Sequence, residues 1–259
     1  MRTFAFPQVE FSHIIHAATS SSDPVPPIET FDTIVDGTRR VLEFSIHSHA
    51  SHFLFLSSGA VYGRQPSSLE RIPESFIGAP ITTLPQSAYG EGKRAAEWLT
   101  FELGNRCGIS TFVARCFAFV GPYLPLDKHY AIGNFIRDAL AGGPIRINSD
   151  GTSFRSYLYS SDLAIWLWTI LLKGQSGEPY NVGSDVSITI KELADCVAKF
   201  MPTRSDVLVA NASVPGALAE KYVPNIDKAR TTLGLDVFTS LDEGIKKTIN
   251  WIRDGNEHG

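Results

Sequence analysis

Residues 53–63 read Phe-Leu-Phe-Leu-Ser-Ser-Gly-Ala-Val-Tyr-Gly, an apolar run that ends in two hydroxyl side chains. A short unbroken apolar run of this kind is typical of a strand in a parallel sheet that is covered on both faces. Further along, residues 89–93 read Tyr-Gly-Glu-Gly-Lys and open a segment whose apolar residues have helical spacing. We therefore predict a strand and a helix that bring Ser58, Tyr89 and Lys93 to one site.

Strands and helices alternate on both sides of this stretch. Residues 11–18 and 111–117 have the composition of strands, and residues 28–49 and 89–106 have apolar residues at helical spacing. The segment 64–87 is rich in Pro and Ser, so we expect a loop over the site rather than core. This order of elements predicts an α/β fold with a doubly wound, parallel, Rossmann-like sheet.

The pattern changes after residue 122. Helices are expected over 132–141, 161–172, 187–200 and 240–253, with strands over 145–147 and 154–159 and with Asp162 capping the second of these helices. We expect residues 1–122 to form a partial dinucleotide-binding domain that carries the Ser/Tyr/Lys site. Residues 123–259 should form mainly a smaller mixed α/β substrate lobe, with some segments returning to the sheet.

The composition excludes several classes of protein. The net charge of -4 provides no basic surface for nucleic acid, and no apolar run reaches the roughly 18 residues that a membrane span needs. The three cysteines are an odd number and lack the spacing of a metal site, which indicates reduced thiols. We expect a soluble cytoplasmic protein with no metal, no membrane span and no nucleic-acid partner.

The chemistry of the central stretch follows from three side chains. A phenol loses its proton near pH ~10, so a tyrosine is a poor base at neutral pH unless a nearby cation lowers its pKa. Tyr89 and Lys93 are four residues apart and therefore share one face of a helix. With a hydrogen bond from Ser58 to the same substrate oxygen, they could take a proton from an alcohol as its carbon loses hydride, or return it.

The combination of motifs along the chain resembles the extended short-chain dehydrogenase/reductase family, the NAD-dependent epimerases and dehydratases of nucleotide sugars. A lone Tyr-x-x-x-Lys match is weak, whereas the ordered set is specific for the family. The matching segments cover nearly the whole chain and are His16-Ala-Ala18, Asp36-Gly-Thr38, residues 57–63, Tyr89-x-x-x-Lys93, Arg115–Pro122, Asp150–Tyr157, Asp162-Leu-Ala164 and Tyr180-Asn-Val-Gly183.

The resemblance implies a role for each matching residue. Ser58 would polarise a sugar hydroxyl or carbonyl, Tyr89 would be the acid/base, and Lys93 would hold the nicotinamide ribose and lower the pKa of Tyr89. These three residues form the expected catalytic set. The residues expected to contact NAD or NADP are Ala17, Ala18, Ser57, Tyr89, Lys93, Cys116 and Phe117. The residues expected to contact the nucleotide-sugar substrate are Ser58, Asn134 and Arg155.

The implied function is NAD(P)-dependent epimerisation or keto-reduction of a nucleotide sugar in surface polysaccharide biosynthesis. The implied assembly is a homodimer that pairs the helices over 28–49 and 89–106. In this family the 4,6-dehydratases carry an acidic pair after the strand-end hydroxyl, but this chain has Gly59 and Ala60, which cannot transfer a proton. A 4,6-dehydratase is therefore the alternative rather than the leading interpretation.

One element of the family pattern is missing from the sequence. Members begin with a strand, a glycine-rich turn and a helix whose amides hold the cofactor pyrophosphate, but the first glycine here is Gly37. We expect an N-terminally truncated sheet with an exposed apolar edge beside Ile14 and Ile15, and weak or no NAD(P) binding by this chain alone. A truncated, non-catalytic remnant and a longer protein with an earlier start are further alternatives.

Overall fold

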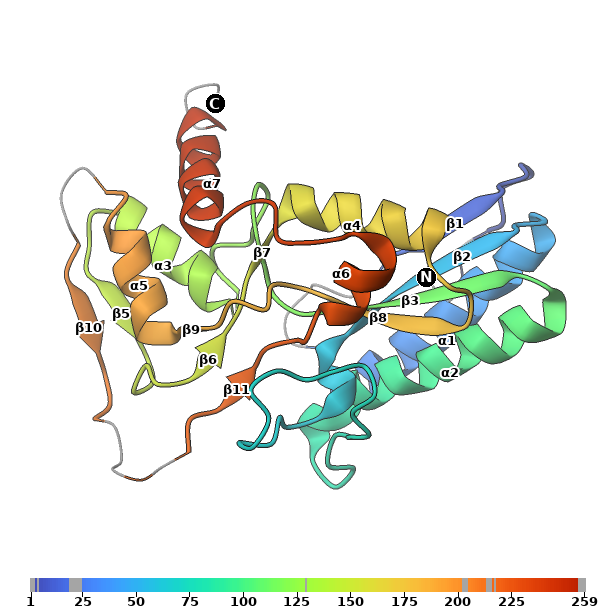
Figure 1. Ribbon diagram of the computed structural model, residues 1–259, viewed down its shortest axis with the longest axis horizontal. Helices are drawn as coiled ribbons and strands as arrows, with labels where there is room; N and C mark the ends of the chain where they lie inside the picture. The colour runs from blue at the N-terminus through green and yellow to red at the C-terminus, as the bar shows by residue number, and fades with distance from the viewer. Residues whose placement is uncertain are drawn as a thin grey trace.

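The computed structural model describes residues 3, 5–18, 25–128, 130–201, 205–212, 216 and 218–255. Its main sheet has four parallel strands in the order β1-β2-β3-β8 (Figure 1). These strands are β1 (His13–His16), β2 (His52–Ser58), β3 (Ser110–Cys116) and β8 (Glu178–Val182). The predicted parallel α/β sheet is confirmed.

Helices cover both faces of this sheet. On one face lie α1 (Pro27–His47) and α2 (Ala88–Cys107), and on the other lie α4 (Ser160–Lys173) and α6 (Asp227–Leu233). Successive side chains of β2 alternate between these layers: Phe53 and Phe55 pack under α1 and α2, whereas Leu54 packs under α4. Burial on both faces explains why β2 reads as a continuous apolar run.

A second group of elements lies beside one end of the sheet (Figure 1). It has its own buried cluster, which includes Ile136, Ile145, Leu193 and Ile249. The helices are α3 (Ala131–Leu140), α5 (Ile190–Ala198) and α7 (Leu241–Gly255). The strands form the pairs β10 (Val207–Val209) with β5 (Ile145–Ile147) and β4 (Phe119–Val120) with β7 (Leu158–Tyr159), and the three-stranded sheet β11 (Lys221–Tyr222), β6 (Phe154–Arg155), β9 (Ile188–Thr189).

Three local expectations were wrong. Residues 154–159 form two short strands, β6 and β7, in different sheets rather than one strand. The segment 64–87 is not wholly outside the core, because Ile72 is fully buried and bridges to Pro224. Asp162 does not cap α4. Its buried carboxylate instead accepts hydrogen bonds from the backbone amides of Phe238 (2.9 Å) and Thr239 (2.8 Å).

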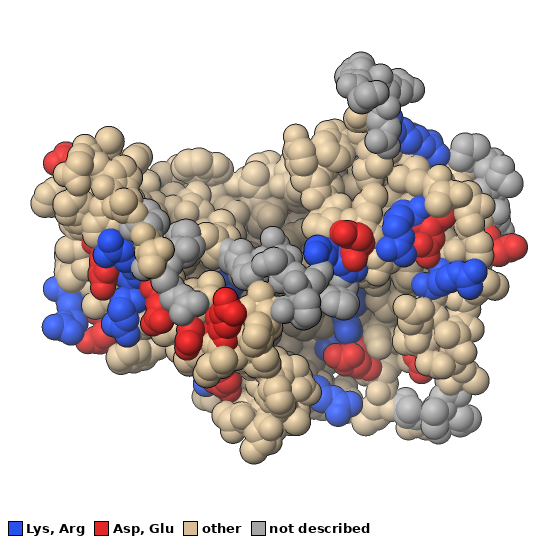
Figure 2. Space-filling model, turned by 180° about the vertical axis from the view of Figure 1, so that it is seen from behind, with Lys and Arg blue, Asp and Glu red and all other residues tan. Residues whose placement is uncertain are grey.

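Among the described residues, β1 is an edge strand that pairs only with β2. Ile14 and Ile15 are half-buried and pack against the two clusters that cover the sheet faces. On the face shown in Figure 2, acidic and basic side chains lie interspersed. No helix in the described part of the chain is both long enough and apolar enough to cross a membrane.

Candidate active site

Ser58 ends β2 and starts the turn that opens the site. Its hydroxyl oxygen accepts a hydrogen bond from the amide of Ala60 (3.1 Å) and so caps a 3-10 turn, Gly59–Tyr62. Gly63 ends this turn with φ of 68°, a left-handed conformation in which a Cβ would also lie 2.1 Å from the carbonyl oxygen of Ala79. Ser58 is therefore held at the carboxyl end of the sheet, where parallel sheets usually bind ligands.

Tyr89 and Lys93 come from the first turns of α2, and both reach the same end of the sheet. The Lys93 ammonium lies 5.8 Å from the centroid of the Tyr89 ring and donates a hydrogen bond to the carbonyl oxygen of Leu56 (2.7 Å). Lys93 is only 4% exposed, and burial lowers the pKa of its ammonium to about 8. The structure thus brings the three expected catalytic side chains together.

The electrostatics of Tyr89 differ from the expectation. Lys93 was expected to lower the pKa of Tyr89, but in this structure burial raises that pKa. Hydrogen bonding with Ser58 is the influence that opposes the rise. The Lys93 ammonium donates to the Leu56 carbonyl, and the groups besides burial that influence the pKa of Tyr89 are Ser58, Cys116 and Tyr130. In the ligand-free chain Tyr89 is therefore protonated at neutral pH.

A buried polar network lies directly behind Ser58. Ser57 points to α2, because it follows Phe53 and Phe55 on the same face of β2, and it donates a hydrogen bond to Glu97 (2.5 Å). Arg115 binds the same carboxylate with its Nη2 atom 2.7 Å from Oε2 and its Nε atom 3.1 Å from Oε1. The hydroxyl of Ser57, expected at the cofactor, is thus engaged by Glu97.

The network continues through Tyr62, which the sequence alone could not distinguish from a packing residue. Arg115 donates to the hydroxyl of Tyr62 (2.9 Å), and that hydroxyl donates to the side chain of Asn181 on β8 (2.8 Å). Asn181 is fully buried and also donates to the carbonyl oxygens of Ile72 and Asn225. These bonds join strands β2, β3 and β8 to the loops at their carboxyl ends.

The remaining residues expected at the cofactor lie around the ends of β1 and β3. Ala17 and Ala18 are exposed and follow β1, so small side chains leave this backbone open to a ligand. Cys116 is in register with Ser58 on the neighbouring strand, and burial raises the pKa of its thiol to about 12. Phe117 is buried, and its amide donates to the carbonyl oxygen of Val182 (3.0 Å).

These residues fit one end of a nicotinamide dinucleotide. Ala17 and Ala18 after β1, Lys93 on α2 and the backbone at Cys116 would hold the nicotinamide end, where the bound cofactor would exchange hydride with the substrate. For the pyrophosphate, the described residues provide no glycine-rich turn between a strand and a helix. The fit is therefore partial.

The two residues expected to bind the nucleotide diphosphate lie in one pocket. Asn134 on α3 and Arg155 on β6 both line a pocket of about 520 Å³, together with Arg137 and Arg146. Guanidinium groups suit the oxygens of a diphosphate, and the carboxylates of Asp138 and Glu220 also line this pocket. Arg155 also contacts Glu220, with 3.2 Å between the Arg155 Nη2 and Glu220 Oε2 atoms.

Tyr222, which sequence analysis did not identify, joins this pocket to the catalytic side chains. It lies on β11, in register with Arg155, whose guanidinium is 6.0 Å from the centroid of the Tyr222 ring. The Tyr222 ring also lies against Phe117, with 4.6 Å between ring centroids. Hydrogen bonding with Ser58 lowers the pKa of Tyr222, against the stronger effect of burial, which raises it.

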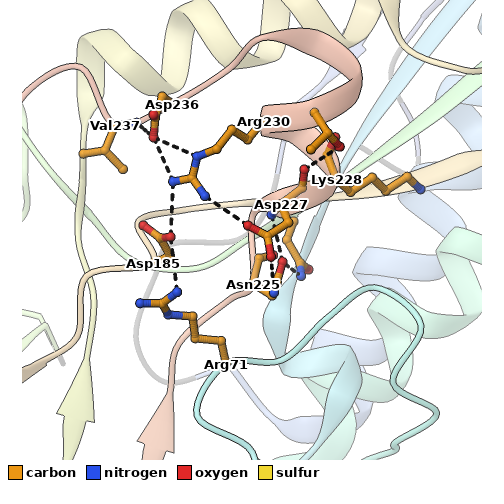
Figure 3. Close-up of polar contacts among 10 residues, drawn as sticks. Arg71, Asp185, Asn225, Asp227, Lys228, Arg230, Asp236 and Val237 are labelled. Atoms are coloured by element: carbon orange, nitrogen blue, oxygen red, sulfur yellow. Dashed lines mark hydrogen bonds and ion pairs between the residues drawn. The ribbon is translucent and has the colours of Figure 1, made fainter.

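An ion-pair cluster fixes the loops next to β8 (Figure 3). Asp185, which follows β8, lies between Arg71 (3.5 Å) and Arg230 (3.2 Å). Arg230 on α6 also binds Asp227 (3.1 Å) and Asp236 (2.9 Å). The cluster ties the segment around residue 71 to α6.

Comparison with known proteins agrees with this architecture. The NAD dependent epimerase/dehydratase family matches residues 2–183. UDP-glucuronic acid decarboxylase 5 of Arabidopsis thaliana is 31% identical over 241 residues, which are 92% of this chain and 69% of that protein. UDP-glucuronic acid decarboxylase 1 of Xenopus tropicalis is 28% identical over 253 residues, which are 96% of this chain and 59% of that protein.

Solved structures share the fold. A UDP-glucose 4-epimerase from Thermotoga maritima, in a structure with UDP-glucose, has a TM-score of 0.83 and 24% identity, with 95% of this chain and 78% of the other covered. A dTDP-glucose 4,6-dehydratase from Bacillus anthracis, in complex with NAD, has a TM-score of 0.78 and 22% identity, with 95% and 74% covered. With its fold, its ordered motifs and these matches, the chain belongs to the NAD-dependent epimerase/dehydratase family.

Proposed function

We propose that this chain binds a nucleoside-diphosphate sugar and acts on it by NAD(P)-dependent epimerisation or keto-reduction. The observation that carries the proposal is the junction between two features. Ser58, Tyr89 and Lys93 lie at the carboxyl end of the sheet, and Tyr222, whose hydroxyl lies beside Gly59, is in register with Arg155 of the pocket. A diphosphate held at Arg155 would direct its sugar toward Ser58 and Tyr89.

The protonation state of Tyr89 favours one direction of the chemistry. Because burial raises its pKa, Tyr89 holds its proton at neutral pH and can donate it to the oxygen of a keto sugar. Ser58 would hydrogen-bond to the same oxygen and orient the carbonyl. The reverse step, removal of a proton from a sugar hydroxyl, needs a lower Tyr89 pKa than the ligand-free chain provides.

A second candidate is decarboxylation of a nucleotide-linked uronic acid, which the identity to plant UDP-glucuronic acid decarboxylases favours. A ketone at C4 of such a sugar is β to the C6 carboxylate, so carbon dioxide can leave without an acidic side chain. That route is compatible with Gly59 and Ala60. Elimination of water, by contrast, needs a proton-transferring pair at these positions.

We propose that NAD(P) binds weakly to this chain alone, because the described residues fit only the nicotinamide end. Isothermal titration with NAD(H) and NADP(H) tests this point. A dissociation constant in the micromolar range would contradict it.

The function itself is tested by incubating the chain with millimolar NAD⁺ and with UDP-glucose or UDP-glucuronic acid, followed by mass spectrometry and NMR of the sugar products. An epimer of unchanged mass supports the first candidate. A product that has lost carbon dioxide supports the second. Tyr89→Phe should abolish either product. Absence of any product at saturating NAD⁺ would favour a non-catalytic role for this chain.

We also propose a cytoplasmic homodimer built on α1 and α2. Trp98 on α2 is 65% exposed, and Ile28 on α1 is 70% exposed, so the outer surface of this helix pair presents large apolar side chains. Cys107, Cys116 and Cys196 are all free thiols, as suits a reducing compartment. A monomer by light scattering, or a dimer unaffected by Trp98→Glu, would contradict the helix-pair dimer.

A further inference from the structure

One buried ion pair anchors both ends of the turn that presents the Ser58 hydroxyl. Before the turn, the hydroxyl of Ser57 donates a hydrogen bond to Glu97 (2.5 Å). At the last residue of the turn, the hydroxyl of Tyr62 accepts a hydrogen bond from Arg115 (2.9 Å). Because Arg115 and Glu97 bind each other at 2.7 Å, both ends of the turn are tied to the same pair of charges.

The carboxylate of Glu97 has little freedom to rearrange. Its Oε1 atom accepts from Ser57 and from the Nε atom of Arg115 (3.1 Å), and its Oε2 atom accepts from the Nη2 atom of Arg115. Both Ser57 and Glu97 are buried. In such surroundings a polar group that loses its partner is costly, so the carboxylate keeps this one orientation.

The anchor also connects the turn to the helix of the acid/base pair. Tyr89, Lys93 and Glu97 follow one another at intervals of four residues along α2 and therefore share one face of this helix. Glu97 holds the end of β2 at Ser57, the residue directly before Ser58. Since successive side chains of a strand point to opposite faces, holding the Ser57 side chain at α2 also fixes the direction of Ser58.

The far end of the turn is attached to a different strand. The Tyr62 hydroxyl donates to the side chain of Asn181 on β8 (2.8 Å), and Asn181 is fully buried. The Asn181 amide group donates in turn to the carbonyl oxygens of Ile72 and Asn225. Ser58 therefore lies in a short turn whose two ends are held by α2 and by β8, which leaves its hydroxyl few positions to occupy.

We propose that the Glu97–Arg115 ion pair is a positioning device for the Ser58 hydroxyl. Through the two hydroxyls that it binds, one before the turn and one at its end, the pair sets the distance between Ser58 and Tyr89. A misplacement of ~1 Å in a catalytic site can lower the rate about a hundredfold. This inference rests on the proposed function, in which Ser58 and Tyr89 act on the same oxygen of the sugar.

The amide proton of Ala60 provides a test that needs no substrate. This amide donates to the Ser58 hydroxyl oxygen (3.1 Å), so its protection reports whether that hydroxyl is in place. Its exchange with solvent is measured by NMR in the ligand-free chain. The reference is the amide of Phe55 in the middle of the paired strand β2, which reports opening of the sheet as a whole.

Two variants break the anchor, one at each end. Ser57→Ala removes the hydroxyl that donates to Glu97. Tyr62→Phe removes the hydroxyl that accepts from Arg115 and keeps the ring. Ser45→Ala is the matched control, because it also removes a buried hydroxyl, one that donates to a backbone carbonyl of α1 (2.7 Å). Circular dichroism checks that each variant is folded.

Relative to Phe55, exchange at Ala60 should be about five- to tenfold faster in both anchor variants, the equivalent of one net hydrogen bond. Ser45→Ala should leave this ratio unchanged. An unchanged ratio in either anchor variant, or an equal rise in Ser45→Ala, would overturn the proposal.

The product assay supplies a second readout. Ser57→Ala and Tyr62→Phe should lower kcat about tenfold or more and leave KM within about threefold, because they displace a catalytic group without removing a contact to the nucleotide. An unchanged kcat in an active chain would also overturn the proposal. Because amide exchange needs no turnover, failure of the proposed enzymatic function is distinguished from failure of this inference.

Discussion

Arg115→Met should destabilise the chain strongly, because it leaves the Glu97 carboxylate buried without its counter-charge. The two side chains are 16% and 8% exposed, and their closest N–O distance is 2.7 Å. Among the described residues, the Ser57 hydroxyl would remain as the hydrogen-bonding side-chain partner of Glu97, with the Lys93 ammonium as a more distant positive charge. Breaking a buried pair from one side costs about 3–5 kcal/mol, a large part of the roughly 5–15 kcal/mol that stabilises a typical domain.

Urea denaturation followed by circular dichroism measures this loss as a lower midpoint. The double variant Arg115→Met/Glu97→Leu removes both charges and should recover at least half of the lost stability. Lys191→Met is the control, since it breaks an exposed pair with Asp195 and should leave the midpoint almost unchanged. A wild-type midpoint for Arg115→Met, or a double variant as unstable as the sum of its single variants, would refute the reasoning.

Three further predictions concern the site and its supports. Lys93→Met should stabilise the ligand-free chain at pH 7 by up to about 3 kcal/mol, because burial lowers the Lys93 pKa from 10.5 to about 8. In urea melts, that gain in stability should shrink between pH 8 and pH 10.5. In this range the folded chain has released the Lys93 proton that the unfolded chain still binds. A gain that does not change with pH would contradict the lowered Lys93 pKa. Gly59→Ala should cost about 1–3 kcal/mol in urea unfolding, since a Cβ there would lie 2.6 Å from the Tyr222 hydroxyl oxygen and 2.8 Å from the Phe117 ring; an unchanged midpoint would count against this tight packing. Asp162→Asn should cost about 1–3 kcal/mol in thermal or urea unfolding, because the amide cannot accept all the bonds that the buried carboxylate receives from Phe238 and Thr239; no measurable loss would show that these bonds are dispensable.

The sequence was sufficient to predict the parallel sheet and the grouping of Ser58, Tyr89 and Lys93, because periodicity and chain order determine them. The two-residue period of a strand also separates Ser57 from Ser58, and the structure shows Ser57 turned to Glu97. The rise in the pKa of Tyr89 could not be predicted in this way, because it depends on how the folded chain buries the phenol. The hydrogen bond from Lys93 to the Leu56 carbonyl is likewise not revealed by residue spacing.

Tyr222 could not be predicted from sequence for a different reason. It lies on a strand of two residues, too short for a periodic signal, and it reaches the site only through its register with Arg155. Ile72 likewise looked like part of a polar loop, but its bridge to Pro224 buries it. Both positions are determined by pairings between segments far apart in the chain, and local pattern carries no information about them.

The central claim is that this chain recognises a nucleotide sugar beside Ser58 and Tyr89, and calorimetric titration with UDP-glucose tests it most directly. We expect saturable binding that Arg155→Ala weakens about tenfold or more, whereas Arg106→Ala, at an exposed position on α2, leaves the affinity unchanged. No heat of binding up to millimolar UDP-glucose, or equal affinity for the wild-type chain and Arg155→Ala, would contradict the claim.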